Sequence, residues 1–211
     1  MRHTDACPGA LQVHQAADGA LVRVRLPGGM ITAAQLATLA NLSTELGSGT
    51  LELTARGNVQ IRGVTDAAAA AEAIAGAGLL PSASHERVRN VVATPLSGRV
   101  GGRADVRPWV GELDAAICAE PALAELGGRF WFSLDDGRGD VSGLAADLGV
   151  HVFDDGIGVL IAGRDTAVRV EDPVTALIDL ARRFAEVRGT AWRITELADV
   201  DDVLPGVRLG D

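Results

Sequence analysis

The stretch LELTARGNVQIRGV, residues 51–64, decides the fold of the chain. Apolar residues at 51 and 53, and again at 59 and 61, alternate with polar residues at the period of a half-buried strand. Gly57 lies between the two runs and tolerates the positive φ that a tight turn requires. The stretch therefore predicts a β-hairpin with one apolar face and one polar face.

The polar face of this hairpin combines guanidinium groups with side-chain amides. A guanidinium group binds a carboxylate or a phosphate through two parallel hydrogen bonds, and amides add neutral donors beside it. This combination predicts a polyanionic ligand. The alternative is a solvated sheet face that carries arginine because all 19 basic residues of the chain are arginine. The polar residues of the hairpin are Thr54, Arg56, Asn58, Gln60 and Arg62.

Length and composition are those of a globular protein with a full core: 211 residues, of which 47% are hydrophobic and 22% charged. The net charge of −9 is unevenly distributed, because residues 51–103 hold six arginines against four acidic residues, whereas residues 104–211 hold ten against twenty-one. A single basic segment in an acidic chain argues against a nucleic-acid partner and favours a compact anion.

Membrane, secretion and metal signals are missing from the sequence. No apolar run approaches the roughly 20 residues of a membrane span, and residues 1–9 lack the pattern of a signal peptide, so we expect a cytoplasmic protein without a membrane partner. Cys7 and Cys118 have no metal-ligand spacing. We therefore expect no metal and no iron–sulfur cluster in the isolated chain. The four histidines are scattered, so the catalytic residues stay unknown.

The first 80 residues predict a ferredoxin-like unit. A strand at 20–26, with Arg23 and Arg25 on a basic outer face, precedes a helix at about 33–46, which Thr32 and Gln35 open as a capping box. The hairpin follows, and Thr65-Asp66 begins an alanine-rich helix that ends near 76–78. In such a unit the helices cover one sheet face, and the arginine and amide groups lie on the other.

A second lobe is expected to follow the linker at 81–85, giving an α+β fold divided into residues 1–80 and 81–211. Its predicted elements are a helix at 106–119, a strand at 130–134, a hairpin over 150–162, a helix from Pro173 to about 188 and a short strand at 191–194. The acidic turn at 135–140 is interpreted as solvated, because it lacks the later glutamate of a calcium loop. The tail from Thr195 is expected to be acidic and partly mobile.

Several segments resemble a known family. TARGNVQIRG (54–63) and RNVVATPLSG (89–98) resemble the two signatures of sirohaem-dependent nitrite and sulfite reductases. CPG (7–9), AADGALVRVRLPGG (16–29) and RFWFSLDDGRGDV (129–141) resemble the precorrin-3B synthase branch of that family, which acts in aerobic cobalamin biosynthesis. The likeness covers nearly the whole chain but only the amino-terminal half of such enzymes, whose cluster-binding cysteines belong to the other half.

The resemblance implies a nitrite/sulfite reductase ferredoxin-like half domain followed by a sirohaem-type lobe. It also implies a tetrapyrrole ligand, either sirohaem or a precorrin, held by arginines and amides. Arg129 and Trp131 stand where the reductases place two lysines, which argues against sulfite or nitrite reduction. The residues expected to bind the tetrapyrrole are Arg56, Asn58, Gln60, Arg62, Arg89, Asn90 and Arg129. We expect Arg56 and Arg89 to reach one cleft between the lobes.

Two functions remain open from the sequence. The first is an oxidoreductase of the precorrin-3B synthase kind, in which precorrin-3A is hydroxylated with ring rearrangement and lactone formation. The second is a non-catalytic tetrapyrrole-binding module, or a half-length relative of the reductases. Because the two halves of family members pack on each other, the resemblance also implies a partner for this chain, either a missing second half or a second copy in a homodimer.

Overall fold

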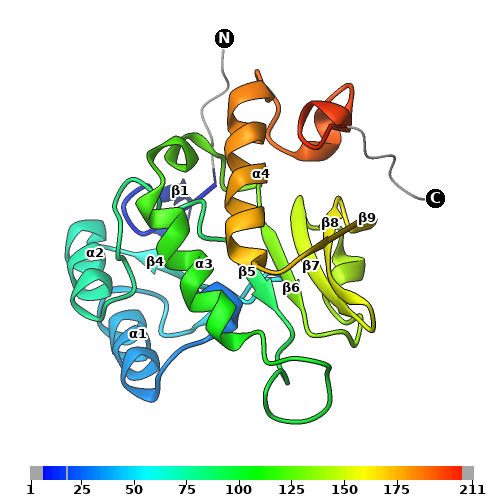
Figure 1. The fold of residues 1–211 in the computed structure, drawn as a ribbon. Helices are drawn as coiled ribbons and strands as arrows, with labels where there is room; N and C mark the ends of the chain where they lie inside the picture. The colour runs from blue at the N-terminus through cyan, green and yellow to red at the C-terminus, as the bar shows by residue number, and fades with distance from the viewer. Residues whose placement is uncertain (1–6, 18, 206–211) are drawn as a thin grey trace.

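A computed structural model describes residues 7–17 and 19–205, which form two lobes with one sheet each (Figure 1). The sheet of the first lobe is antiparallel throughout, in the order β1-β2-β4-β3. Its strands are β1 (His14–Ala16), β2 (Gly19–Val24), β3 (Glu52–Leu53) and β4 (Val59–Val64). β3 and β4 form the predicted hairpin, and Val59 and Ile61 are buried in the core as expected.

Two helices, α1 (Ala33–Leu46) and α2 (Ala67–Gly76), pack on the first sheet. The Thr32 hydroxyl accepts a hydrogen bond from the Gln35 N–H, and the Gln35 side chain accepts one from the Thr32 N–H, so the predicted capping box is present. Asp66 caps α2 by accepting the N–H groups of Ala68 and Ala69. These caps fix where both helices begin, and the ferredoxin-like unit follows the predicted order.

The second lobe combines parallel and antiparallel strands in the order β5-β6-β7-β8-β9. The first three are parallel, and the β7–β8–β9 meander is antiparallel. α3 (Arg107–Ala119) and α4 (Pro173–Val187) lie side by side over this sheet (Figure 1). The strands are β5 (Val91–Ala93), β6 (Phe132–Asp135), β7 (Leu148–Phe153), β8 (Gly156–Ile161) and β9 (Arg164–Val170). Phe130 lies between the rings of Phe132 and Phe184 in the core beneath the helices.

The carboxyl-terminal part of the second lobe differs from the sequence prediction. Residues 191–194 form no strand, because a 3-10 helix (Ile194–Glu196) begins there instead. The described part of the tail is packed, since Val203 is fully buried against the core of the second lobe. Residues 206–211 lie outside the described residues. Further 3-10 helices span Pro27–Gly29, Pro121–Glu125, Ser142–Leu144 and Val200–Asp202.

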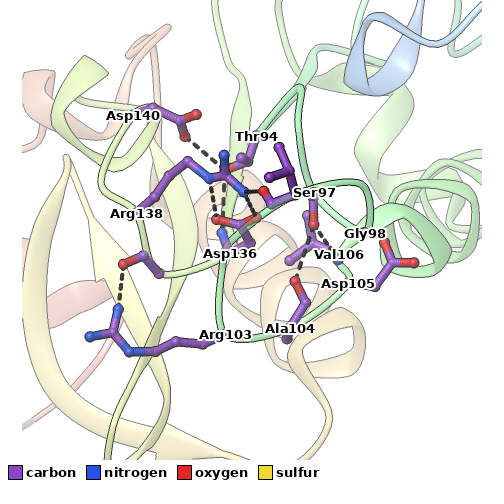
Figure 2. A network of polar contacts seen from close by, with 12 residues as sticks. Thr94, Ser97, Gly98, Arg103, Ala104, Asp105, Val106, Asp136, Arg138 and Asp140 are labelled. Carbon is purple, nitrogen blue, oxygen red and sulfur yellow. Dashed lines mark hydrogen bonds and ion pairs between the residues drawn. The ribbon is translucent and has the colours of Figure 1, made fainter.

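The acidic turn at 135–140 begins with two buried carboxylates, which corrects its interpretation as solvated, while Gly139 and Asp140 at its far end are exposed. The side chains of Asp135 and Asp136 are fully buried. Asp136 accepts two hydrogen bonds from Arg138, at 2.9 and 2.8 Å, and Arg103 donates to the Gly137 carbonyl (Figure 2). Asp135 accepts backbone N–H groups from residues 137, 139, 141 and 142. The two carboxylates therefore fix the conformation of the loop, and Arg138 and backbone N–H groups bind them where a calcium loop would have a metal ion.

No helix within the described ranges is long and apolar enough to cross a membrane.

Candidate functional site

Two of the predicted site residues, Asn58 and Asn90, meet where the lobes join. The side-chain oxygen of Asn58 accepts a hydrogen bond from the Leu26 N–H at 2.9 Å, and its side-chain nitrogen lies 3.4 Å from the Asn90 side-chain oxygen. Both side chains are buried, and the side-chain nitrogen of Asn90 lies within hydrogen-bond distance of three backbone oxygens, which share its two N–H donors. Those acceptors are the carbonyls of Arg87, Gly128 and Phe130, at 2.8, 3.1 and 3.2 Å. The two amides therefore fasten the lobes together, a role that leaves them few donors for a ligand.

Arg56 projects from the β3–β4 turn towards the second lobe. Its Nη1 donates to the Gly128 carbonyl at 3.0 Å, and its guanidinium carbon lies 5.4 Å from the centroid of the Trp131 ring. Burial lowers the pKa of Arg56, and the positive charge of Arg193 adds to that effect, while Asp147 opposes it. No described carboxylate forms an ion pair with Arg56. Its charge is thus held in place by neutral groups and is available to an anion.

A hollow of about 360 Å³ opens beside Arg56, and we call it the Arg56 hollow. Gly57 and Gly29 form one edge, both with positive φ, and a Cβ added to Gly57 would lie 3.5 Å from the Gly29 Cα. Asp140 also lines the hollow, and its carboxylate accepts a hydrogen bond from the Thr94 hydroxyl at 2.7 Å (Figure 2). The remaining lining is Gly28, Val92, Ala93, Pro95 and Val141. The hollow therefore offers one cation, one carboxylate and an otherwise apolar wall.

Gln60 and Arg62 project from β4 to the outer face of the first sheet, as predicted, but a neighbouring carboxylate holds both of them. Glu52 on β3 accepts from Gln60 Nε2 at 2.5 Å and from Arg62 Nε at 3.0 Å. Hydrogen bonds from Gln60 and Arg62 lower the pKa of Glu52. Arg23 on β2 donates a hydrogen bond to the side-chain oxygen of Gln60 at 2.8 Å and extends the same polar row. Arg62 is thus neutralised within its own sheet.

Arg89 is also paired, which corrects the expected convergence with Arg56. Its Nε and Nη2 donate to the two carboxylate oxygens of Asp114 on α3, both at 2.7 Å. Arg89 and Asp114 line a separate hollow of about 180 Å³, which Arg56 does not reach. Arg129 is exposed, and its side chain forms no ion pair with any residue in the described part of the chain. Among the predicted cations, the Arg56 hollow contains Arg56 alone.

The sequence did not identify four charged residues near this site. Arg23 and Arg25 were predicted only as the basic face of a strand, and Arg25 is in fact buried. Arg193 approaches from beyond α4 and binds Asp147 at 2.7 Å, which brings a third guanidinium group close to Arg56. The one available signal was the position of Arg25 directly before Leu26-Pro27-Gly28-Gly29, a turn that packs at the junction of the lobes.

The comparison with family models identifies the first lobe. Residues 14–74 match the model described as "Nitrite/Sulfite reductase ferredoxin-like half domain". The match covers the sheet, its two helices and the arginine-bearing hairpin. Residues 14–74 are a nitrite/sulfite reductase ferredoxin-like half domain. The resemblance of the TARGNVQIRG segment is thereby confirmed.

Longer relatives extend the similarity beyond this half domain. A precorrin-3B synthase from Sinorhizobium sp is 32% identical over 158 residues, which are 73% of this chain and 34% of the relative. The structure of the Mycobacterium tuberculosis NirA protein superimposes with a TM-score of 0.64 at 20% identity, over 80% of this chain and 34% of NirA. The α+β fold and the family-level relationship to precorrin-3B synthase are confirmed. The chain spans about a third of the length of each of these two proteins.

Proposed function

We propose that the half domain and its second lobe bind a carboxylate-rich tetrapyrrole, either sirohaem or a precorrin, at the Arg56 hollow. The observation that carries this proposal is a guanidinium group without a described carboxylate partner at the rim of a hollow whose wall is apolar except for Asp140. A tetrapyrrole has the matching chemistry, because its ring is apolar and its rim carries anionic side chains.

The residues of the hollow fit one edge of such a ring. Gly29 and Gly57 let the backbone approach closely, and Val92 and Val141 offer apolar contact to a ring face. A volume of about 360 Å³ lies near the lower end of the roughly 300–1,000 Å³ of small-molecule sites. The rest of the macrocycle would therefore lie outside this hollow, against a second half or a second copy of the chain.

The relationship to precorrin-3B synthase supports a place in an oxidoreductase of that kind, with the precorrin as substrate. The chain spans 34% of that relative, so the proposed reaction requires further polypeptide. Within the described ranges no three His, Cys, Asp or Glu side chains are grouped to hold a metal ion. The part that we assign to this chain is to bind and orient the anionic rim of the ring.

Binding can be measured by absorption titration with uroporphyrin III, an eight-carboxylate porphyrin, as the probe. Arg56→Gln should weaken binding about tenfold, or about 1.4 kcal/mol, as expected for the loss of one charge-assisted contact. Arg183→Gln, an exposed position on α4, is the matched control and should bind like the wild type. A porphyrin with cationic substituents should not bind. Equal affinities of the two variants, or equal binding of the cationic porphyrin, would reject the proposal.

A further inference from the structure

Arg25, at the junction of the lobes, is a buried cation with an unsatisfied donor. Its residue surface is only 3% exposed, and its Nε donates to the Arg87 carbonyl at 3.3 Å. Its Nη1 is buried and has no hydrogen-bond partner among the residues that the structure describes. Burial, followed by the positive charges of Arg23 and Arg56, lowers the pKa of Arg25 to about 10, although Cys7 and Glu86 act in the opposite direction. A buried guanidinium group of this kind is stabilised by a nearby anion.

The sulfur of Cys7 lies beside this guanidinium group. A Cβ atom added to Gly128 would be 3.3 Å from Arg25 Nη2, 3.3 Å from Cys7 Sγ and 2.6 Å from Cys7 Cβ. The carbonyl of the same glycine accepts the hydrogen bond from Arg56. Cys7 and two guanidinium groups therefore surround one backbone position.

The carboxylates closest to this cluster are already engaged. Glu86 accepts the backbone N–H groups of residues 10, 11 and 12, at 2.7, 2.7 and 2.9 Å. Asp147 is bound by Arg193 and by the N–H groups of residues 131 and 194. Arg23 and the exposed Arg129 add further positive charge on the sides of β2 and Gly128. The field at Cys7 thus favours an anion, and a thiolate is the anion that the local sequence can supply.

We propose that Cys7 is a thiolate at neutral pH and forms a modification site for small soft electrophiles. Arg25 and Arg56 stabilise the charged sulfur, which is the nucleophilic form of a cysteine. With iodoacetamide as the electrophile, the sulfur forms a bond to the methylene carbon while the carbon–iodine bond breaks and iodide leaves. Cys7 is partly accessible, as such a reaction requires. The site does not depend on the tetrapyrrole proposal, since no bound ring takes part.

Cys118 provides an internal control in the same molecule. Cys118 is partly exposed to solvent, as Cys7 is. Burial raises the pKa of the Cys118 thiol, and the negative charge of Asp114 acts in the same direction. At pH 7, mass spectrometry of the two cysteine-containing peptides should show alkylation of Cys7 at least about tenfold faster than that of Cys118. Across pH 5.5–9.5, the Cys7 rate should reach half of its maximum well below the roughly 8.5 of an unperturbed thiol.

Arg25→Gln tests the charge, because it should slow Cys7 alkylation at pH 7 about tenfold and move the half-maximal pH upward. Its rate on the high-pH plateau should match the wild type, which separates lost charge from changed access. Arg56→Gln should act in the same direction and serves if Arg25→Gln does not fold, while Arg183→Gln should change nothing. A wild-type half-maximal pH of about 8.5 or higher, or an unchanged value in both variants, would overturn the proposal.

Discussion

Arginine has three different roles in this protein, and the surroundings of each residue decide which. Arg89 is 5% exposed in its side chain and forms a two-bond ion pair with Asp114. Arg62 forms an ion pair of similar length with Glu52, but both of those side chains are 41% exposed. Arg56 has no carboxylate partner in the described part of the chain. Arg89 therefore stabilises the fold, the charge of Arg62 is screened by water, and Arg56 can bind a ligand.

Arg89→Ala should lower the free energy of unfolding by about 3–5 kcal/mol, because it leaves the Asp114 carboxylate partly buried beside no cation. Arg62→Ala should lower it by less than about 1 kcal/mol, since the exposed Glu52 is readily hydrated. Urea unfolding of both variants at pH 7 measures the difference. Equal losses would show that Arg89 does not have the structural role assigned to it.

The sequence predicts those features of the candidate site that lie within one lobe, but not the contacts between distant segments. The polar row on β4 follows from strand alternation, which sets the face of each side chain, and Arg56 follows from the predicted turn between β3 and β4. Arg25 has the same alternation as Arg23 and was therefore predicted on the basic outer face of the strand, but it is buried at the junction of the lobes. The Arg89–Asp114 pair joins residues from a loop and a helix 25 positions apart. Contacts of that kind depend on tertiary packing, which residue spacing does not encode.

At the scale of elements, local signals predicted the helices well and the strands less evenly. The capping box at Thr32 and the proline at 173 placed the starts of α1 and α4 where the structure has them. β9 was not predicted, because Arg164–Val170 has no regular alternation and contains a positive φ at Ala167. The loop after β6 was predicted as solvated, because charged residues usually are. Asp135 and Asp136 are nevertheless buried, because backbone N–H groups replace the water around Asp135 and Arg138 replaces the water around Asp136.

That loop should make stability sensitive to acid. Burial alone would raise the pKa of Asp135, but hydrogen bonds from four backbone N–H groups outweigh it and lower that pKa. The stabilisation is therefore complete above the ordinary pKa of about 3.9 and is lost as the pH falls through the lower folded value. Asp135→Asn should lower the free energy of unfolding at pH 6 by roughly 1–3 kcal/mol. Acidification should then destabilise this variant less than the wild type.

Thermal unfolding between pH 6 and pH 3 measures this dependence. Asp201→Asn, at an exposed position in the Val200–Asp202 turn, is the control and should keep the wild-type slope. An Asp135→Asn variant with that same slope would show that the carboxylate does not control the acid response.

At the scale of the whole molecule, the prediction of a partner for this chain concerns the edge of the first sheet. β3 is an edge strand, and its Leu53 is 81% exposed. Edge strands with apolar side chains favour pairing with another strand, and identical chains most often pair about a two-fold axis. We predict a homodimer in which the arginine-bearing sheet faces lie near that axis.

Light scattering at micromolar concentrations and moderate salt should then give twice the chain mass of 21.7 kDa. Leu53→Asp should return the protein to the mass of one chain, because it places a charge on the paired edge. Leu144→Asp, at a position 52% exposed in the second lobe, should leave the dimer intact. A wild-type mass of 21.7 kDa at every concentration would contradict the prediction.

The turn at Pro27–Gly29 couples sequence variation in the two lobes. Gly28 has a φ of +63°, and a Cβ there would lie 3.0 and 3.1 Å from the Val110 methyl groups on α3 and 3.6 Å from Ala93 on β5. The backbone of the first lobe at Gly28 thus packs directly against side chains of the second lobe. Any side chain accepted at position 28 would require a matching change across the junction, so neither lobe is free to vary, or to be exchanged for that of a relative, without the other.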